Sequence, residues 1–270
     1  MKGFEIVQCE ACNFVFVNPR INNNDLYKLY SEDYFTSQTE AYGYKDYELT
    51  SHLRIKTFEK WISDISPYLS KEKGAILDIG CASGYFLELM REKGWDPEAI
   101  ELDKKMIEKL KTKGFQVFER PFEEFKSDKK FKLITMFDVL EHVPDLKTTF
   151  QKFHDLLDED GIIALITPDF NSFQRKFFGK KWFQFKPQEH IQYFSPGTLA
   201  KSIQQFDLEL VKTGPSGQYA DTGFLLDRLE RYRFQVFKKL ASFFVNLFGL
   251  KKNYWYPDTG SFLAIIKKKK

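Results

Sequence analysis

The sequence predicts an α/β fold built on a doubly wound, mainly parallel sheet of seven strands. From residue 74 onward, short apolar runs alternate with amphipathic stretches, which is the pattern of βαβ units. Glycines or a proline end several of these segments, as at Gly94, Gly114 and Pro168. The 270 residues are 43 % hydrophobic and 17 % aromatic, enough for a large core, which excludes a disordered chain.

Charge and cysteine content narrow the class of protein further. The 41 Lys and Arg residues against 38 Asp and Glu give a net charge of +3, too small for a nucleic-acid footprint. Three cysteines (Cys9, Cys12 and Cys81) cannot form a disulfide framework. The apolar stretch Phe243–Leu250 is far below the ~18 residues of a membrane span, and the N-terminus has no apolar signal region. We therefore expect a soluble cytoplasmic protein without a nucleic-acid partner.

The first 70 residues precede the alternating pattern. Residues 1–20 predict a hairpin, because two β-prone runs flank the pair Cys9 and Cys12. Residues 21–70 predict a helical extension or cap, with helices over Leu26–Tyr30 and His52–Leu69.

The alternating pattern predicts one domain over residues 71–215 and 258–270. Its expected helices cover Tyr85–Lys93, Lys104–Lys113, Lys147–Leu157 and Thr198–Gln205. Its expected strands are Ala75–Ile79, Pro97–Leu102, Phe115–Phe118, Leu133–Phe137, Gly161–Thr167, Leu208–Lys212 and Ser261–Ile266.

Residues 216–257 predict an amphipathic helical insertion into that domain. Apolar residues recur at steps of three and four through residues 224–250, which forms one helical stripe flanked by lysines. Three interpretations stay open. The stripe packs on the domain, it forms a lid or a dimer surface, or it rests on a membrane surface as basic amphipathic helices do.

The sharpest motif is a glycine-containing turn after the first predicted strand of this domain. Gly80 and Gly84 allow a ligand to approach the backbone closely, and N–H groups at the following helix start can face it. Glu101 ends the next strand, where an acid can accept both hydroxyls of a ribose. Ala82 replaces the second glycine of a dinucleotide turn, and Asp78 would repel a pyrophosphate. Both favour a ligand with an ammonium or sulfonium cation over a nicotinamide dinucleotide.

The segment Asp78-Ile79-Gly80-Cys81-Ala82-Ser83-Gly84 resembles the first motif of the class I S-adenosylmethionine-dependent methyltransferases, D-x-G-x-G-x-G, apart from Ala82. The resemblance covers roughly residues 70–212 and the last strand. It implies a Rossmann-like methyltransferase fold and S-adenosylmethionine as cofactor. The cofactor contacts that it implies are Asp78, Gly80, Ala82, Gly84, Tyr85, Glu101, Leu102, Phe122, Glu123, Phe137, His142 and Tyr34.

The aromatic segment Lys181–Ser195 follows the fifth strand, a position that covers the acceptor side of the pocket in this branch of the family. It contains His190, which is our candidate general base, because histidine is well suited to take a proton near neutral pH. The alternative is that His190 only hydrogen-bonds the loop. The spacing of His52 and His154 implies no metal site.

The pair Cys9 and Cys12 resembles half of a zinc ribbon, which some methyltransferases of this branch carry before the catalytic domain. A structural zinc site needs four ligands, and this segment supplies two. A plain hairpin with two reduced thiols is the other interpretation.

The expected function is methyl transfer from S-adenosylmethionine to a small-molecule oxygen, nitrogen or carbon nucleophile, sugar-like or lipid-like. Two alternatives belong to other classes. One is a methyltransferase-like protein that binds the cofactor without turnover. The other is a nicotinamide-dependent oxidoreductase, which Ala82 and Asp78 disfavour.

Overall fold

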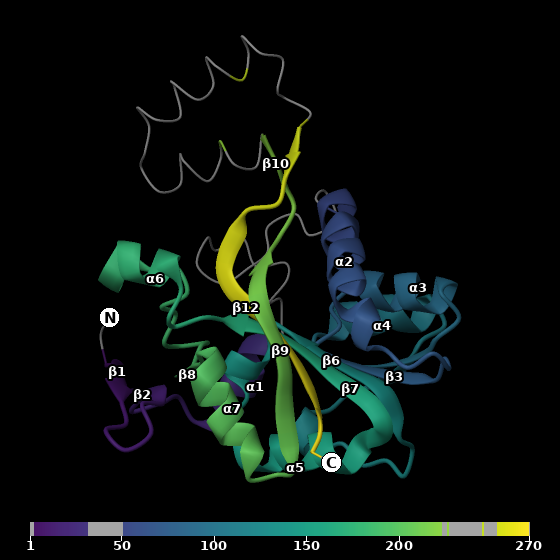
Figure 1. The fold of residues 1–270 in the computed structure, drawn as a ribbon, viewed down its shortest axis with the longest axis horizontal. Coiled ribbons are helices and arrows are strands. Elements are labelled where there is room, and N and C mark those ends of the chain that lie inside the picture. The colour runs from purple at the N-terminus through teal and green to yellow at the C-terminus, as the bar shows by residue number, and fades with distance from the viewer. Residues whose placement is uncertain (1–2, 32–50, 223–225, 227–244, 246–252, 270) are drawn as a thin grey trace.

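The fold is taken from a computed structural model, which describes residues 3–31, 51–222, 226, 245 and 253–269 (Figure 1). The predicted Tyr34 and most of the stripe 224–250 lie outside these residues. Within the described part of the chain, no helix is long and apolar enough to span a membrane.

A seven-stranded sheet forms the centre of the fold and confirms the predicted fold class. The first five strands in the order below run parallel to one another. Strand β12 runs antiparallel to both β7 and β9. The strand order is β5 (Gln116–Phe118), β4 (Asp96–Ile100), β3 (Ala75–Ile79), β6 (Phe131–Phe137), β7 (Leu157–Pro168), β12 (Asp258–Lys268) and β9 (Leu208–Gly217).

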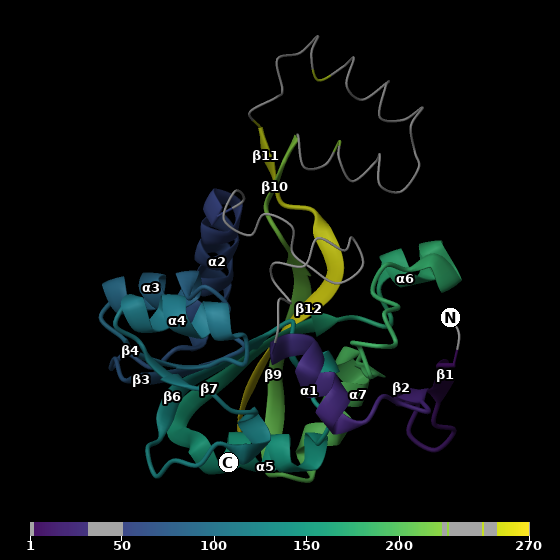
Figure 2. The same cartoon turned by 180° about the vertical axis from the view of Figure 1, so that it is seen from behind.

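Helices cover both faces of this sheet, as the two opposite views show (Figures 1 and 2). Successive residues of a strand point to opposite faces, so Ile76 and Leu77 of β3 belong to different core clusters. The cluster of Ile76 includes residues from α2 (Ser51–Ile65), α3 (Tyr85–Glu92) and α4 (Lys104–Thr112). The cluster of Leu77 includes residues from α5 (Leu146–Leu156) and α7 (Pro196–Gln204).

The N-terminal segment forms an antiparallel hairpin of β1 (Glu5–Gln8) and β2 (Val15–Asn18), which is followed by α1 (Asn23–Ser31). Strand β2 also pairs with the short β8 (Gln192–Tyr193). The hairpin is therefore joined to the aromatic segment that follows β7. A small core of Val15, Val17, Trp182 and Tyr193 lies between them.

Several elements differ in length from the sequence prediction, and the reason can be given for three of them. The helix over His52–Leu69 ends at Ile65, and Pro67 lies in a 3-10 turn, Ser66–Tyr68. Strand β7 begins at Leu157, where the sequence predicts the end of a helix, because Leu157 pairs with Phe131. Strand β9 continues through Pro215, which an edge strand tolerates because its second side needs no N–H donor.

Several short elements were absent from the prediction. Helix α6 (Phe173–Phe178) follows β7, and short 3-10 helices cover Phe122–Glu124, Leu140–His142 and Gly179–Lys181. Strands β10 (Ala220–Asp221) and β11 (Tyr254–Trp255) pair at the two ends of the insertion. Because β9 reaches Gly217, the predicted insertion boundary at residue 216 falls within a strand.

Candidate functional site

The glycine turn, Gly80–Gly84, connects the end of β3 to the start of α3. Gly80 has φ +74°, and a Cβ there would lie 2.5 Å from Val139 Cγ2. Gly84 has φ +79° and precedes the first residue of α3. Both positions therefore require glycine. Gly80 is exposed although β3 before it is buried, so the turn presents backbone at the surface.

Glu101 ties the glycine turn to the end of β4. Its Oε2 accepts a hydrogen bond from Ala82 N at 2.8 Å, and its Oε1 accepts bonds from Leu102 N at 2.7 Å and Asp103 N at 3.0 Å. The side chain is buried, and burial raises its pKa although these donors oppose the shift. Each carboxylate oxygen has two lone pairs, so Oε2 retains acceptor capacity for a ligand hydroxyl.

Asp78 is buried next to the turn and accepts a hydrogen bond from Thr135 Oγ1 at 2.6 Å. Burial raises the pKa of Asp78 to about 7, and the nearby Glu101 adds to the rise. The same surroundings raise the pKa of the Cys81 thiol. Two buried acids lie beside a turn in which Gly80 is exposed and Cys81–Gly84 are buried. This arrangement suits a ligand that carries hydroxyl donors and a cationic centre. The residues present thus fit the methionine and ribose parts of S-adenosylmethionine.

Other predicted cofactor contacts lie around this turn. Tyr85 opens α3 under the ammonium of Lys113, which is 4.9 Å from the ring centroid. Leu102 is half-buried beside Glu101. Phe137, half-buried at the end of β6, has its ring centroid 5.0 Å from that of Trp61 and 5.3 Å from that of Phe86. The sequence did not predict that Trp61 lies next to Phe137.

Two of the predicted cofactor contacts face away from the turn. The Phe122 side chain is 3 % exposed in the core and packs on Phe153, so its ring is not available to stack on an adenine. Glu123 accepts a hydrogen bond from the Tyr27 hydroxyl of α1. An adenine contact from this segment would therefore have to come from backbone.

His142 also differs from its prediction, because it lies with the acceptor-side segment. Its Nδ1 is 2.9 Å from the Glu189 carbonyl oxygen, and its ring centroid is 4.7 Å from that of His190. Glu141 beside it accepts a hydrogen bond from Thr167 Oγ1 at 2.9 Å. We call Glu141, His142 and His190 the acceptor-side cluster. Sequence reasoning had placed His142 and His190 in different sites.

Burial sets the charge state of the acceptor-side cluster. It lowers the pKa of His142 to about 4, and it holds the pKa of His190 well below its usual value. Both imidazoles are therefore neutral near pH 7. Burial also raises the pKa of Glu141 to about 8 and that of the neighbouring Asp138 to about 6. A histidine with so low a pKa is a weak general base.

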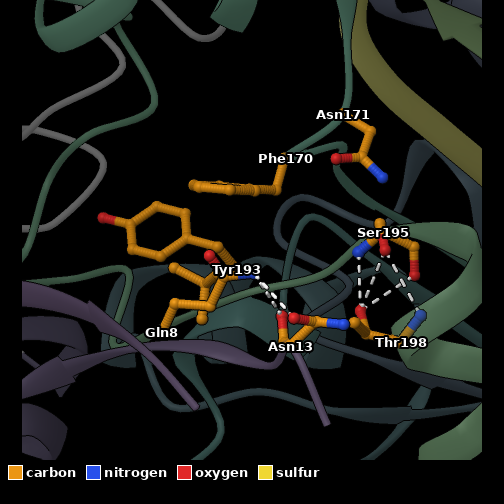
Figure 3. Close-up of a pocket in the computed structure, with 8 residues that line it drawn as sticks. Gln8, Asn13, Phe170, Asn171, Tyr193, Ser195 and Thr198 are labelled. Atoms are coloured by element: carbon orange, nitrogen blue, oxygen red, sulfur yellow. Dashed lines mark hydrogen bonds between the residues drawn. The ribbon is translucent and has the colours of Figure 1, made fainter. Parts of the chain in front are cut away.

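A small surface pocket lies elsewhere, between the N-terminal hairpin and the start of α7 (Figure 3). The rings of Phe170 and Tyr193 border it, with Asn13, Ser195 and Thr198 on its other side. Its lining includes no residue of the glycine turn or of the acceptor-side cluster, so it does not identify the reaction site.

Comparison with known proteins identifies the family. Residues 51–213, more than half of the chain, match the family model of a methyltransferase domain. The chain is 26 % identical over 172 residues to a ubiquinone biosynthesis O-methyltransferase of Bordetella avium, covering 58 % of this chain and 68 % of that protein. It is 29 % identical over 150 residues to the Pelagibacter ubique protein of the same name, covering 51 % and 62 % respectively.

A solved structure shows the same fold. An S-adenosylmethionine-dependent methyltransferase from Clostridium acetobutylicum is 13 % identical and superposes with a TM-score of 0.53, covering 83 % of this chain and 96 % of the other. The parallel sheet, the glycine turn and the matched family model agree with one another. The chain therefore belongs to the class I S-adenosylmethionine-dependent methyltransferases.

Proposed function

We propose that this enzyme transfers the methyl group to a hydroxyl oxygen of a small-molecule acceptor. The observation that carries the proposal is the acceptor-side cluster, in which His142 follows β6 and His190 precedes β8. Strand β6 lies next to β3, which leads into the cofactor turn. Neutral imidazoles can interact with a hydroxyl proton without repelling a cationic methyl donor. The two curated relatives named above are O-methyltransferases, which supports oxygen as the accepting atom.

The cofactor side of the proposal assigns roles to the glycine turn and its neighbours. Backbone from Gly80 to Gly84 and the Asp78 carboxylate position the methionine part, and Glu101 accepts the ribose hydroxyls. Phe137 borders the methyl donor, backed by Trp61 and Phe86. Tyr85 and Leu102 contact the remaining cofactor surface.

The bound cofactor supplies a methyl group on a sulfonium, which is already a good leaving group. With the cofactor bound, the acceptor oxygen would gain the methyl carbon as the sulfur took the electron pair of the S–C bond, and the hydroxyl proton would pass to the acceptor-side cluster. The chain's contribution is alignment of oxygen, carbon and sulfur and exclusion of water, which together can lower the barrier by several kcal/mol, up to roughly 7–11. The sequence predicts that His190, in the acceptor-side cluster, accepts this proton.

The compartment forms part of the same proposal. Cys9, Cys12 and Cys81 are free thiols. Reduced thiols fit a reducing compartment such as the cytoplasm.

The test is product analysis. The full-length protein is incubated with S-adenosylmethionine and, separately, with catechol, glucose, acetate and histamine, and methylated products are identified by mass spectrometry. We expect methylation of a hydroxyl oxygen and none of the acetate carboxylate or of the amine. His190→Asn should slow the reaction by about 100-fold, the low end for general acid–base catalysis, because His190 is a weak base. His154→Asn, on the surface of α5, should leave the rate unchanged.

Methylation confined to the amine nitrogen would overturn the oxygen assignment. An unchanged rate in His190→Asn would remove the acceptor-side cluster from the reaction.

A further inference from the structure

The acceptor-side cluster has the composition of a metal site. Glu141 and His142 end a 3-10 helix after β6, and His190 lies 48 residues further on, just before β8. One ligand atom from each residue lies within 4.8 Å of the other two. Two ligands with bonds of about 2.1 Å to one ion in a tetrahedral site are about 3.4 Å apart. The three side chains would therefore need to close in by up to about 1.4 Å to bind one ion.

His142 has the orientation of a metal ligand. A carbonyl oxygen can only accept, so His142 Nδ1 donates its hydrogen to the Glu189 carbonyl at 2.9 Å. In the neutral ring the lone pair then lies on Nε2. Nε2 points toward Glu141 Oε1, 3.9 Å away. A hydrogen bond from one imidazole nitrogen to a backbone carbonyl is the arrangement that fixes metal-binding histidines.

Glu141 is held in the matching way. Its Oε2 accepts the Thr167 hydroxyl at 2.9 Å, and its Oε1 is the oxygen on the side of His142. The side chain is 2 % exposed. An imidazole lone pair and a carboxylate oxygen that face each other at this distance repel. A proton on Glu141, whose pKa burial raises, or a cation bound between the two atoms removes that repulsion.

His190 supplies the independent observation. It is 4 % exposed, and its Nδ1 is buried without a hydrogen-bond partner in the part of the chain that the structure describes. Leaving such a buried polar atom unpaired destabilises the folded protein. An ion bound at this nitrogen would remove that cost.

One cation already lies near the cluster. Lys186 Nζ is 3.7 Å from Glu189 Oε2, and the lysine side chain is 41 % exposed. A charged lysine ammonium donates hydrogen bonds and accepts none, and the structure pairs Lys186 with Glu189. Lys186 therefore balances Glu189 and leaves the ligand set of the cluster in place.

We propose that Glu141, His142 and His190 bind one divalent transition-metal ion. Two imidazoles and one carboxylate suit zinc, manganese, iron or cobalt better than magnesium or calcium. Three protein ligands leave coordination positions for water or for the acceptor. This inference deepens the proposed function and rests on it for the acceptor. A hydroxyl bound to the ion releases its proton more readily, with the neighbouring Asp138 carboxylate as acceptor. His190 then acts as a ligand instead of as the base.

The test measures metal binding without cofactor or acceptor, so its outcome is separate from that of the methylation assay. The full-length protein is stripped with EDTA and titrated with Zn²⁺ by calorimetry and with Co²⁺ by visible absorption, with Mg²⁺ for comparison. We expect one Zn²⁺ or Co²⁺ per chain. His190→Asn and Glu141→Gln should each weaken binding at least tenfold.

Two controls separate this site from others in the chain. His154→Asn removes a surface histidine paired with Asp155 and should bind as the wild type does. Cys9→Ser with Cys12→Ser removes the hairpin thiols, which are the competing zinc ligands, and should also leave binding intact. Titration with S-adenosylmethionine verifies that each variant is folded.

Absence of Zn²⁺ and Co²⁺ binding by the wild-type protein would overturn the proposal. Binding that survives His190→Asn, or that is lost with the two cysteines, would overturn it as well. If His190→Asn does not fold, the Co²⁺ spectrum of the wild type decides, because thiolate ligands add an intense charge-transfer band that imidazole and carboxylate ligands lack.

Discussion

The glycine turn and the acceptor-side cluster lie at the ends of neighbouring strands, but they are built in different ways. In the turn, the buried Glu101 carboxylate is held by three backbone N–H groups from nearby residues. In the cluster, Glu141 and His190 come from distant segments, and His190 Nδ1 has no partner among the described residues. The turn therefore has its hydrogen bonds in place before any ligand binds. The cluster, in contrast, contains a buried polar atom whose missing hydrogen-bond partner a ligand would supply.

Gly80→Ala should give the largest effect on the turn. The substitution places a Cβ in a left-handed conformation and 2.5 Å from Val139 Cγ2, so the turn must move. A displacement of about 1 Å at a binding site can cost about 100-fold. We expect a loss of that order in S-adenosylmethionine affinity, measured by calorimetry.

Gly94→Ala is the matched control. Gly94 also has a positive φ, +84°, but nothing lies within 4 Å of an added Cβ. It should lower the melting temperature through backbone strain and leave cofactor affinity unchanged. Equal cofactor affinities in the two variants would contradict a binding role for the turn.

Glu101→Gln should give the next largest effect. The amide keeps the size of the side chain, but it removes one acceptor oxygen and the negative charge that the ribose hydroxyls would meet. Cofactor affinity should fall by about 1–3 kcal/mol, which is about 5- to 150-fold. Glu98→Gln is the control, since Glu98 lies on the same strand and pairs with Lys129 at 2.6 Å. If both variants bind the cofactor alike, Glu101 does not contact it.

Asp78→Asn should show a smaller effect that depends on pH. Burial raises the pKa of Asp78 from 3.8 to about 7, so the folded state favours the protonated acid. The stability from this group is fully present below pH 3.8 and is lost as pH rises through about 7. The free energy of unfolding of the wild type, relative to Asp78→Asn, should therefore fall by about 2–3 kcal/mol between pH 5 and 7.5.

Both proteins contain the same histidines. Subtracting their free energies of unfolding therefore removes the contribution of the histidines to the pH dependence. Urea titrations across this pH range measure it. A difference that stays constant with pH would show that Asp78 is ionised in the folded protein throughout.

The contrast between the two regions also explains what the sequence could predict. Strand β3, the turn and Glu101 follow from local patterns, because a buried run, two glycines and an acid at the end of the next strand lie within about 25 residues. The start of β7 at Leu157 could not be predicted, because its pairing with Phe131 is a tertiary contact.

The acceptor-side cluster depends on contacts that spacing along the chain does not reveal. His142 and His190 are each adjacent to a glutamate, but their ring contact arises only because the segment before β8 folds back on the 3-10 helix after β6. The Asp138-x-x-Glu141-His142 spacing after a buried strand was the available signal. That spacing places acidic and histidine side chains on one turn of the chain, but it does not reveal that His190 joins them.

The most direct test of the division between the two regions is calorimetric titration of S-adenosylmethionine into the wild type, Glu101→Gln and His190→Asn, all in EDTA. The account predicts that the wild type and His190→Asn bind alike, within about twofold, and that Glu101→Gln binds at least about fivefold more weakly. Loss of binding in His190→Asn, with Glu101→Gln unaffected, would contradict it and would assign the cofactor to the acceptor-side cluster.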